Sequence, residues 1–186
     1  MKNINLLRNL YHLKNVERNI TVKNRKESPA EHSWSCLILA DYFLAKIKDI
    51  DRLKVYELLM YHDLVEIETG DTCISKVKER ENKKEVEQEA LRILKNKIPL
   101  ELKDKFVNLF TEFEEQKTRE AKFAKAVDAL DAEIHLLDYK DDWKGWTEGF
   151  VRKCKEHLFE EFPEMKEVFE KVTVYIREQG FFDQVT

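Results

Sequence analysis

Apolar residues recur along this chain at helical spacing, with lysine and glutamate between them. The clearest stripe comprises Phe123, Val127, Leu130, Ile134 and Leu137. Its positions advance by alternating steps of four and three residues, which places these side chains on one face of a helix predicted over residues 118–139. The only β-like run, at residues 20–22, is too short to build a sheet. The pattern therefore predicts an all-α protein.

The same spacing predicts further helices between turn-forming residues. They span about residues 3–13, 28–47, 51–66, 85–95, 100–113, 147–161 and 163–179. The segment from Trp34 to Ile47 is apolar on most faces, so we expect its helix to be central and largely buried. We expect the helices at 85–95 and 100–113 to be peripheral. Gly70 is expected to mark the end of the helix that follows Asp51, or a turn shortly after it.

Two local signals mark the start of the helix that contains His32. Ser28 can cap it, with Glu31 three residues later completing a capping box. Pro29 takes the first helical position, where its missing N–H is not needed. His32 is therefore expected in the first turn of this helix.

Composition narrows the class of protein. A chain of 186 residues suits one domain, which we assign to residues 1–186 as a helical bundle. The formal net charge is -4, so no basic excess favours a nucleic-acid polymer as partner, and a phosphate ligand would need a local cluster of cations. No stretch approaches 18 apolar residues, which predicts that the chain does not enter a membrane. The three cysteines, Cys36, Cys73 and Cys154, are odd in number and widely spaced, as is typical of a cytoplasmic protein.

The candidate chemistry begins at His62-Asp63, which follows a strongly apolar helix. Burying two titratable side chains without partners is expensive, and a divalent cation removes that cost because it prefers neutral imidazole and ionised carboxylate as ligands. Two adjacent residues cannot make a site alone. His32 and Asp128, each on a separate apolar helix, are the best placed partners. Asp131, three residues after Asp128, is the alternative fourth ligand.

Four segments occur in an order that resembles the HD-domain phosphohydrolases, and among them the 5'-deoxynucleotidase branch. They are ESPAEHSW at 27–34, HDLVE at 62–66, TGD at 69–71 and EAKFAKAVD at 120–128. The resemblance implies an HD-domain helical bundle with a metal site at its centre, held by His32, His62, Asp63 and Asp128. It also implies that Glu66 is the catalytic carboxylate, that Asp71 binds the sugar, that Arg18 contacts the phosphate, and that the protein is a homodimer.

These roles agree with the chemistry of the residues. Glu66 lies four residues beyond His62, which would put it on the same helix face, within reach of the water or the leaving oxygen as a general acid or base. The predicted reaction is the hydrolysis of (deoxy)nucleoside monophosphates to a nucleoside and inorganic phosphate. Co²⁺ or Mn²⁺ is the expected cation, and Mg²⁺, Fe²⁺, Zn²⁺ and Ni²⁺ also suit histidine and aspartate ligands.

Several alternatives stay open. In the 5'-deoxynucleotidase branch a tryptophan follows the phosphate-binding arginine, whereas here Asn19 follows Arg18, which leaves the preferred sugar open. Lys23, Arg25 and Lys26 are further candidates for the phosphate contact. The substrate could instead be a nucleoside triphosphate, a cyclic nucleotide or an alarmone, or the protein could sense nucleotides without turnover.

Other polar or aromatic positions have simpler interpretations. His12, His135 and His157 lack companions at ligand spacing and are expected to be surface or packing residues. Trp143 and Trp146 could line a dimer contact or cap the core. The charged stretch at residues 76–89 is expected to be a solvated face.

Overall fold

The computed structural model describes residues 2–72 and 82–183. Its α-helices are α1 (Lys2–Leu10), α2 (Pro29–Leu44), α3 (Arg52–Tyr61), α4 (Glu66–Thr69), α5 (Lys83–Lys97), α6 (Leu100–Glu115), α7 (Arg119–His135), α8 (Glu148–Lys155) and α9 (Pro163–Glu178). Short 3-10 helices η1 (Tyr11–Asn15), η3 (Leu136–Asp138), η4 (Lys140–Trp143) and η5 (Glu156–Phe159) connect them. The prediction of an all-α fold is confirmed. Cys73 and part of the charged stretch at 76–89 lie outside the described residues.

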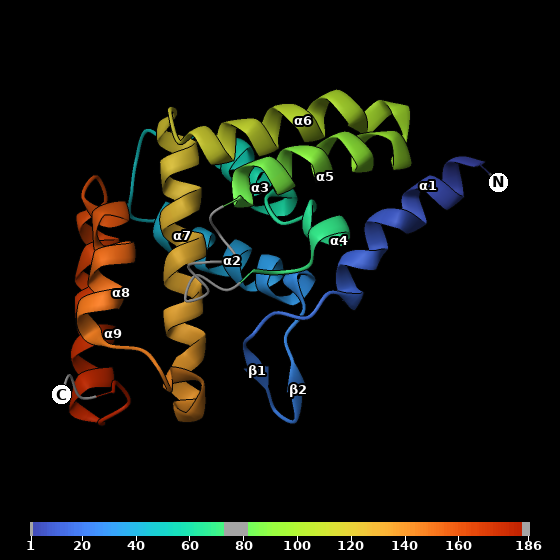
Figure 1. Ribbon diagram of the computed structural model, residues 1–186. Helices are drawn as coiled ribbons and strands as arrows, with labels where there is room; N and C mark the ends of the chain where they lie inside the picture. Colours follow the sequence, from blue (N-terminus) through green and yellow to red (C-terminus); the bar gives the residue numbers. More distant parts are fainter. Residues whose placement is uncertain (1, 73–81, 184–186) are drawn as a thin grey trace.

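Helices α2, α3 and α7 pack against one another and form the centre of the molecule. Figure 1 shows α7 standing between α2 and α3 on one side and the α8–α9 pair on the other, while α5 and α6 lie side by side across one end. The predicted apolar stripe of α7 faces the core, with Phe123, Val127 and Leu130 fully buried. Buried apolar residues from all of these helices form one continuous cluster.

Helix α2 begins where its sequence signals predict. The Ser28 hydroxyl accepts a hydrogen bond from the backbone N–H of Glu31, whose carboxylate accepts one from the backbone N–H of Ser28. Pro29 occupies the first turn. This capping box fixes the start of the helix that carries His32.

The expectation that α2 is central is confirmed, but the expectation that it is largely buried is wrong. Cys36, Ala40 and Phe43 are fully buried, whereas Trp34 is 66% exposed and Ile38 is 57% exposed. Trp34 and Ile38 lie one turn apart on the outer face of the helix, since α2 is covered by α3 and α7 on its inner side.

The expectation that α6 is peripheral is also wrong, whereas most residues of α5 are exposed and this helix packs mainly on α4 and α6. Phe106, Phe110 and Phe113 of α6 are each exposed by no more than 2%, and Leu94 of α5 is fully buried. Helix α6 packs on both α3 and α7, so it closes the end of the bundle nearest the candidate site.

The run at residues 20–22 forms part of a two-stranded antiparallel hairpin, β1 (Thr21–Val22) and β2 (Arg25–Lys26). Polar contacts hold this hairpin to the segment after α7. Asp142 accepts hydrogen bonds from the backbone N–H and the hydroxyl of Thr21, and the Tyr139 hydroxyl accepts one from the backbone N–H of Lys23. The loop before α2 is therefore fixed in place by residues more than a hundred positions away.

Among the described residues, none of the helices combines the length and the apolar character that crossing a membrane requires.

Candidate metal centre

The structure brings His32, His62, Asp63 and Asp128 together from α2, the turn after α3, and α7. The Nε2 atom of His62 lies 3.1 Å from Asp63 Oδ2 and 4.0 Å from Asp128 Oδ1. The Nε2 atom of His32 lies 3.0 Å from the same Asp128 oxygen. Both imidazoles therefore direct Nε2 towards one group of carboxylate oxygens.

The hydrogen bonds of His62 fit a metal ligand. Its Nδ1–H donates to the Leu59 carbonyl oxygen at 2.8 Å, an arrangement that leaves Nε2 with a free lone pair. That Nε2 atom is buried and has no hydrogen-bond partner of suitable geometry within residues 2–72 and 82–183. A buried lone pair beside two carboxylates is a donor set that suits a divalent cation.

The second ring nitrogen of His32, Nδ1, contacts Asp131. Asp131 Oδ2 lies 2.9 Å from His32 Nδ1 and also accepts a hydrogen bond from the Ser35 hydroxyl at 2.9 Å. Asp131 thus contacts the side of the ring opposite to Asp128. This is the arrangement in which a second carboxylate orients a metal-binding histidine. His32, Cys36 and Asp131 form a second buried group of potential ligands, but burial raises the pKa of the Cys36 thiol to about 12, which keeps it protonated.

The two carboxylates of the cluster stay ionised despite their burial. Burial acts to raise the pKa of Asp63, but the neighbouring His62 and His32 lower it to about 2. Burial likewise opposes ionisation of Asp128, and Lys125 with the two histidines holds its pKa well below its usual range. Both side chains therefore present the charge state that a cation binds.

Glu66 lies beside the cluster, although not for the reason that the sequence suggested. Helix α3 ends at Tyr61, residues 62–65 form a turn, and Glu66 begins the short helix α4. His62 and Glu66 therefore do not share one helix face. Burial, together with the charges of Asp63 and Asp71, raises the pKa of Glu66 to about 10.

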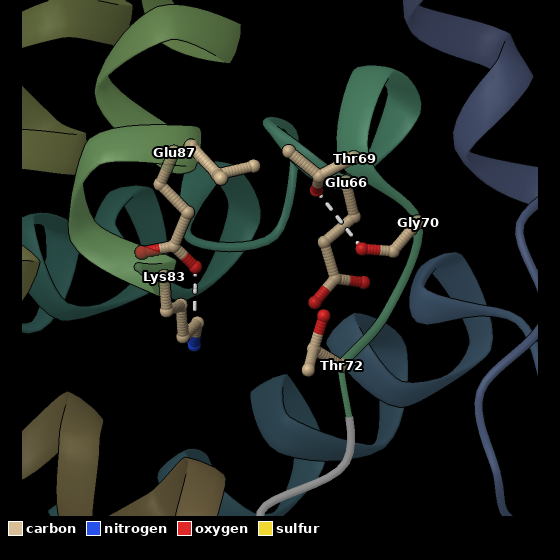
Figure 2. A pocket seen from close by; sticks show the side chains of 7 residues that line it. Glu66, Thr69, Gly70, Thr72, Lys83 and Glu87 are labelled. Carbon is tan, nitrogen blue, oxygen red and sulfur yellow. Dashed lines mark hydrogen bonds and ion pairs between the residues drawn. The ribbon is translucent and has the colours of Figure 1, made fainter. Parts of the chain in front are cut away.

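A pocket opens next to Glu66. It is lined by Glu66, Thr69, Gly70, Thr72, Lys83, Val86 and Glu87. Figure 2 shows the carboxyl group of Glu66 on one side, with Lys83 and Glu87 of α5 across from it. Glu66 Oε2 is buried and has no hydrogen-bond partner in the part of the chain that the structure describes, so it could pair with a bound molecule.

Arg18 lies near the cluster and is largely buried. Its Nη1 is 3.1 Å from Glu27 Oε2. Burial acts to lower its pKa, but Asp63, Glu27 and Asp128 outweigh that effect and raise it. Asp71 accepts a hydrogen bond from the backbone N–H of Asn19 at 3.4 Å, so the predicted phosphate and sugar contacts are neighbours.

Two other cations of the same loop have partners outside the cluster. Arg25 pairs with Glu31 on the surface, and Lys26 lies 4.0 Å from Asp142. Of the loop side chains whose ion pairs are described, Arg18 is the one whose charge interacts with Asp63 and Asp128.

The sequence interpretation missed Lys125. Its Nζ lies 3.0 Å from Asp128 Oδ2 and 4.6 Å from the centre of the Phe113 ring, which in turn packs against His62. A signal was present, because Lys125 precedes Asp128 by three residues and so lies on the same side of α7. Lys83 pairs with Glu87 in the pocket wall, but no candidate site residue lies three or four positions from Lys83 in the sequence.

The residues that were expected to be surface or packing residues differ in their exposure. His12 and His157 are exposed. His135 is half-buried, with Nε2 2.8 Å from the Thr21 carbonyl oxygen and its ring stacked on Tyr139. Trp143 is 1% exposed and donates a hydrogen bond to the Leu136 carbonyl oxygen, so it packs in the core.

Fold and site together define an all-helical protein with two histidines and two carboxylates gathered as a candidate metal centre. Residues 10–166 match the HD domain family. The chain belongs to that family.

Curated relatives match about two thirds of the chain. A 5'-deoxynucleotidase of Bos taurus is 28% identical over 126 residues, which cover 68% of this chain and 59% of the relative. A 5'-deoxynucleotidase of Schizosaccharomyces pombe is 29% identical over 125 residues, covering 65% and 62%. This chain thus matches about three fifths of the length of these curated relatives.

Solved structures extend the similarity to nearly the whole chain. A protein from Magnetospirillum magnetotacticum, described as a predicted metal-dependent phosphohydrolase, superposes with a TM-score of 0.85 at 26% identity, covering 98% of this chain and 97% of that one. A conserved hypothetical protein from Pyrococcus furiosus superposes with a TM-score of 0.65, also at 26% identity, covering 91% and 98%.

Proposed function

We propose that this protein is a metal-dependent phosphohydrolase that removes the 5'-phosphate from (deoxy)nucleoside monophosphates. The observation that carries the proposal is the buried Nε2 of His62, which lies near Asp63 and Asp128 and finds no hydrogen-bond partner among the described residues. The similarity to 5'-deoxynucleotidases supports the choice of substrate.

The metal site in this proposal consists of His32, His62, Asp63 and Asp128. A divalent cation bound there would supply Lewis acidity, activating water and polarising the phosphoryl group. Asp131 is assigned to the orientation of His32, because it contacts Nδ1 and leaves Nε2 facing the other ligands.

Glu66 is proposed to carry the proton that the reaction requires. In the metal-free protein its raised pKa favours the protonated carboxyl group, and that proton can pass to the 5'-oxygen as the bond to phosphorus breaks. The resulting carboxylate can take a proton from the attacking water. Proton transfer in both directions restores Glu66 at the end of the cycle.

Arg18 and Asp71 are proposed to hold the substrate. The guanidinium of Arg18 can form charge-assisted hydrogen bonds to phosphate oxygens, and the carboxylate of Asp71 can accept one from a sugar hydroxyl. Because Asp71 and Asn19 are hydrogen-bonded, phosphate and sugar would be bound by adjacent parts of one surface.

The finer features of the proposal rest on the sequence. They are Co²⁺ or Mn²⁺ as the cation, a homodimer in solution, a cytoplasmic location, a single HD domain over residues 1–186, and mononucleotides as substrates in place of nucleic-acid polymers.

A metal-reloading assay tests this function. Metal-free protein would be supplied in turn with Co²⁺, Mn²⁺ and Mg²⁺, and phosphate release would be measured with dAMP, AMP and the other mononucleotides. Release with at least one cation is expected, and the ratio of dAMP to AMP turnover reports the sugar preference. Nucleotide binding without release under any cation would favour a sensor and contradict the proposal.

A further inference from the structure

Glu27 is a buried carboxylate in contact with Arg18, and the proposed function gives it no role. The side chain of Glu27 is 4% exposed, and its Oε2 lies 3.1 Å from Arg18 Nη1. The backbones are joined as well, since the N–H of Arg18 donates to the Glu27 carbonyl oxygen at 2.8 Å. Both ends of Arg18, backbone and guanidinium, are thus held by one residue.

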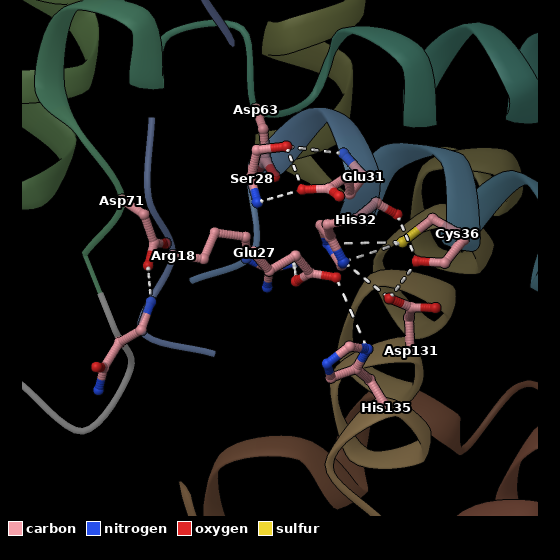
Figure 3. A network of polar contacts seen from close by, with 12 residues as sticks. Arg18, Glu27, Ser28, Glu31, His32, Cys36, Asp63, Asp71, Asp131 and His135 are labelled. Atoms are coloured by element: carbon pink, nitrogen blue, oxygen red, sulfur yellow. Dashed lines mark hydrogen bonds and ion pairs between the residues drawn. The ribbon is translucent and has the colours of Figure 1, made fainter. Parts of the chain in front are cut away.

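The other oxygen of Glu27 faces the end of α7. Glu27 Oε1 lies 3.8 Å from His135 Nδ1, and the other nitrogen of that ring is 2.8 Å from the Thr21 carbonyl oxygen. The backbone N–H of Glu27 donates to the Ile20 carbonyl oxygen at 2.8 Å. Figure 3 shows Glu27 between Arg18 and His135, next to the start of α2. The carboxylate is therefore fixed from several directions.

The position of Glu27 in the chain connects Arg18 to the metal centre. The next residue, Ser28, caps α2, and His32 lies in the first turn of that helix. On the other side, the charge of Arg18 interacts with Asp63 and Asp128. A displacement of Glu27 would move the guanidinium relative to these carboxylates.

We propose that Glu27 is a positioning residue that holds the Arg18 guanidinium towards the metal centre, where Arg18 binds the phosphate of the substrate. The inference rests on the proposed function for the role of Arg18. A guanidinium has five N–H donors, and Glu27 engages Nη1, so donors on the other nitrogens can meet phosphate oxygens. The cost of removing two charges from water offsets much of their attraction, so a buried ion pair adds little net stability, and an orienting role is compatible with that.

Binding of inorganic phosphate tests this role without turnover. Calorimetric titrations would compare the Co²⁺-loaded wild type with Glu27→Gln, Arg18→Met and the double variant. Glu27→Gln is expected to weaken phosphate binding about tenfold and to leave Co²⁺ affinity within about threefold of the wild type. Because Glu27 acts through Arg18, the double variant should bind phosphate no more weakly than Arg18→Met alone.

Glu133→Gln is the matched control. Glu133 is equally buried and paired with Lys155, and among the described residues no hydrogen bond or ion pair links either side chain to the cluster, so phosphate binding should not change. Glu27→Asp retains the charge and should bind phosphate with intermediate affinity, which provides a second variant if Glu27→Gln does not fold.

Three results would overturn the role of Glu27: unchanged phosphate binding in Glu27→Gln, additive losses in the double variant, or a wild type that does not bind phosphate. Phosphate binding that depends on Glu27, in a protein that releases no phosphate from mononucleotides, would contradict the proposed function and leave the positioning role standing.

Discussion

The Nδ1 atom of His32 lies 2.9 Å from Oδ2 of Asp131. A carboxylate at this distance accepts a hydrogen bond from Nδ1–H, which directs Nε2 towards Asp128, 3.0 Å away, and makes Nε2 the ring nitrogen that a bound cation would use. Asparagine can present an N–H to Nδ1 instead, which would move the ring proton to Nε2.

Asp131→Asn should therefore weaken metal binding by about 10- to 100-fold. A Co²⁺ titration followed by visible absorption measures this loss. Asp138→Asn is the control. Asp138 is exposed and lies in η3, directly after α7, so this variant should bind Co²⁺ as the wild type does. Equal affinity in Asp131→Asn and the wild type would show that Asp131 does not control the state of the His32 ring.

The capping box of α2 should affect metal binding as well as stability. Ser28→Ala removes the acceptor for the Glu31 N–H and should lower the free energy of unfolding by about 1 kcal/mol, measured by urea denaturation. Thr147→Ala removes the corresponding cap of α8 and should have a similar cost. Only Ser28→Ala should weaken Co²⁺ binding, because α2 carries His32. Equal Co²⁺ affinity in both variants would argue against this link.

The raised pKa of Glu66 predicts a pH-dependent stability difference in metal-free protein. The pKa rises from 4.5 to about 10 on folding, because of burial and the charges of Asp63 and Asp71. A group whose pKa is raised on folding stabilises the native state fully below its unfolded pKa, and this contribution is lost as pH rises towards the folded pKa.

Glu66→Gln should therefore be more stable than the wild type at pH 8, with the difference shrinking towards about pH 4. Urea denaturation across this range measures it. A wild type as stable as the variant at pH 8 would contradict a raised pKa.

The buried pair of Glu133 and Lys155 joins α7 to α8. Lys155 Nζ donates to Glu133 Oε1 at 2.5 Å and to the Ala129 carbonyl oxygen at 3.2 Å. Lys155→Met leaves a buried carboxylate without its partner and should lower the free energy of unfolding by about 3 kcal/mol. The double variant with Glu133→Leu should recover most of this loss. A single variant that loses less than about 1 kcal/mol would show that water reaches Glu133.

Local signals in the sequence predicted much of the fold. The cap at Ser28, the proline after it and the stripe of α7 are contained in a few neighbouring residues, and the structure places the helices accordingly. The burial of α2 could not be predicted in the same way. Trp34 and Ile38 are as apolar as Phe43, and which of them is covered depends on where α3 and α7 pack.

The candidate site, too, was predictable only where its residues are close together in the sequence. His62-Asp63 stood out because the two residues are adjacent in an apolar segment. The contact between Glu27 and His135 and the orientation of His32 by Asp131 join residues about a hundred positions apart. No spacing rule predicts such contacts, because tertiary packing creates them.

The central claim is that His32, His62, Asp63 and Asp128 bind one catalytic cation. The most direct measurement is a titration of metal-free protein with Co²⁺ in which bound metal and phosphate release from dAMP are followed in the same samples. We predict that both signals saturate at one equivalent per chain, and that both are lost in His62→Ala but retained in His157→Ala, an exposed histidine. Metal-independent release, or full release by His62→Ala, would contradict the account.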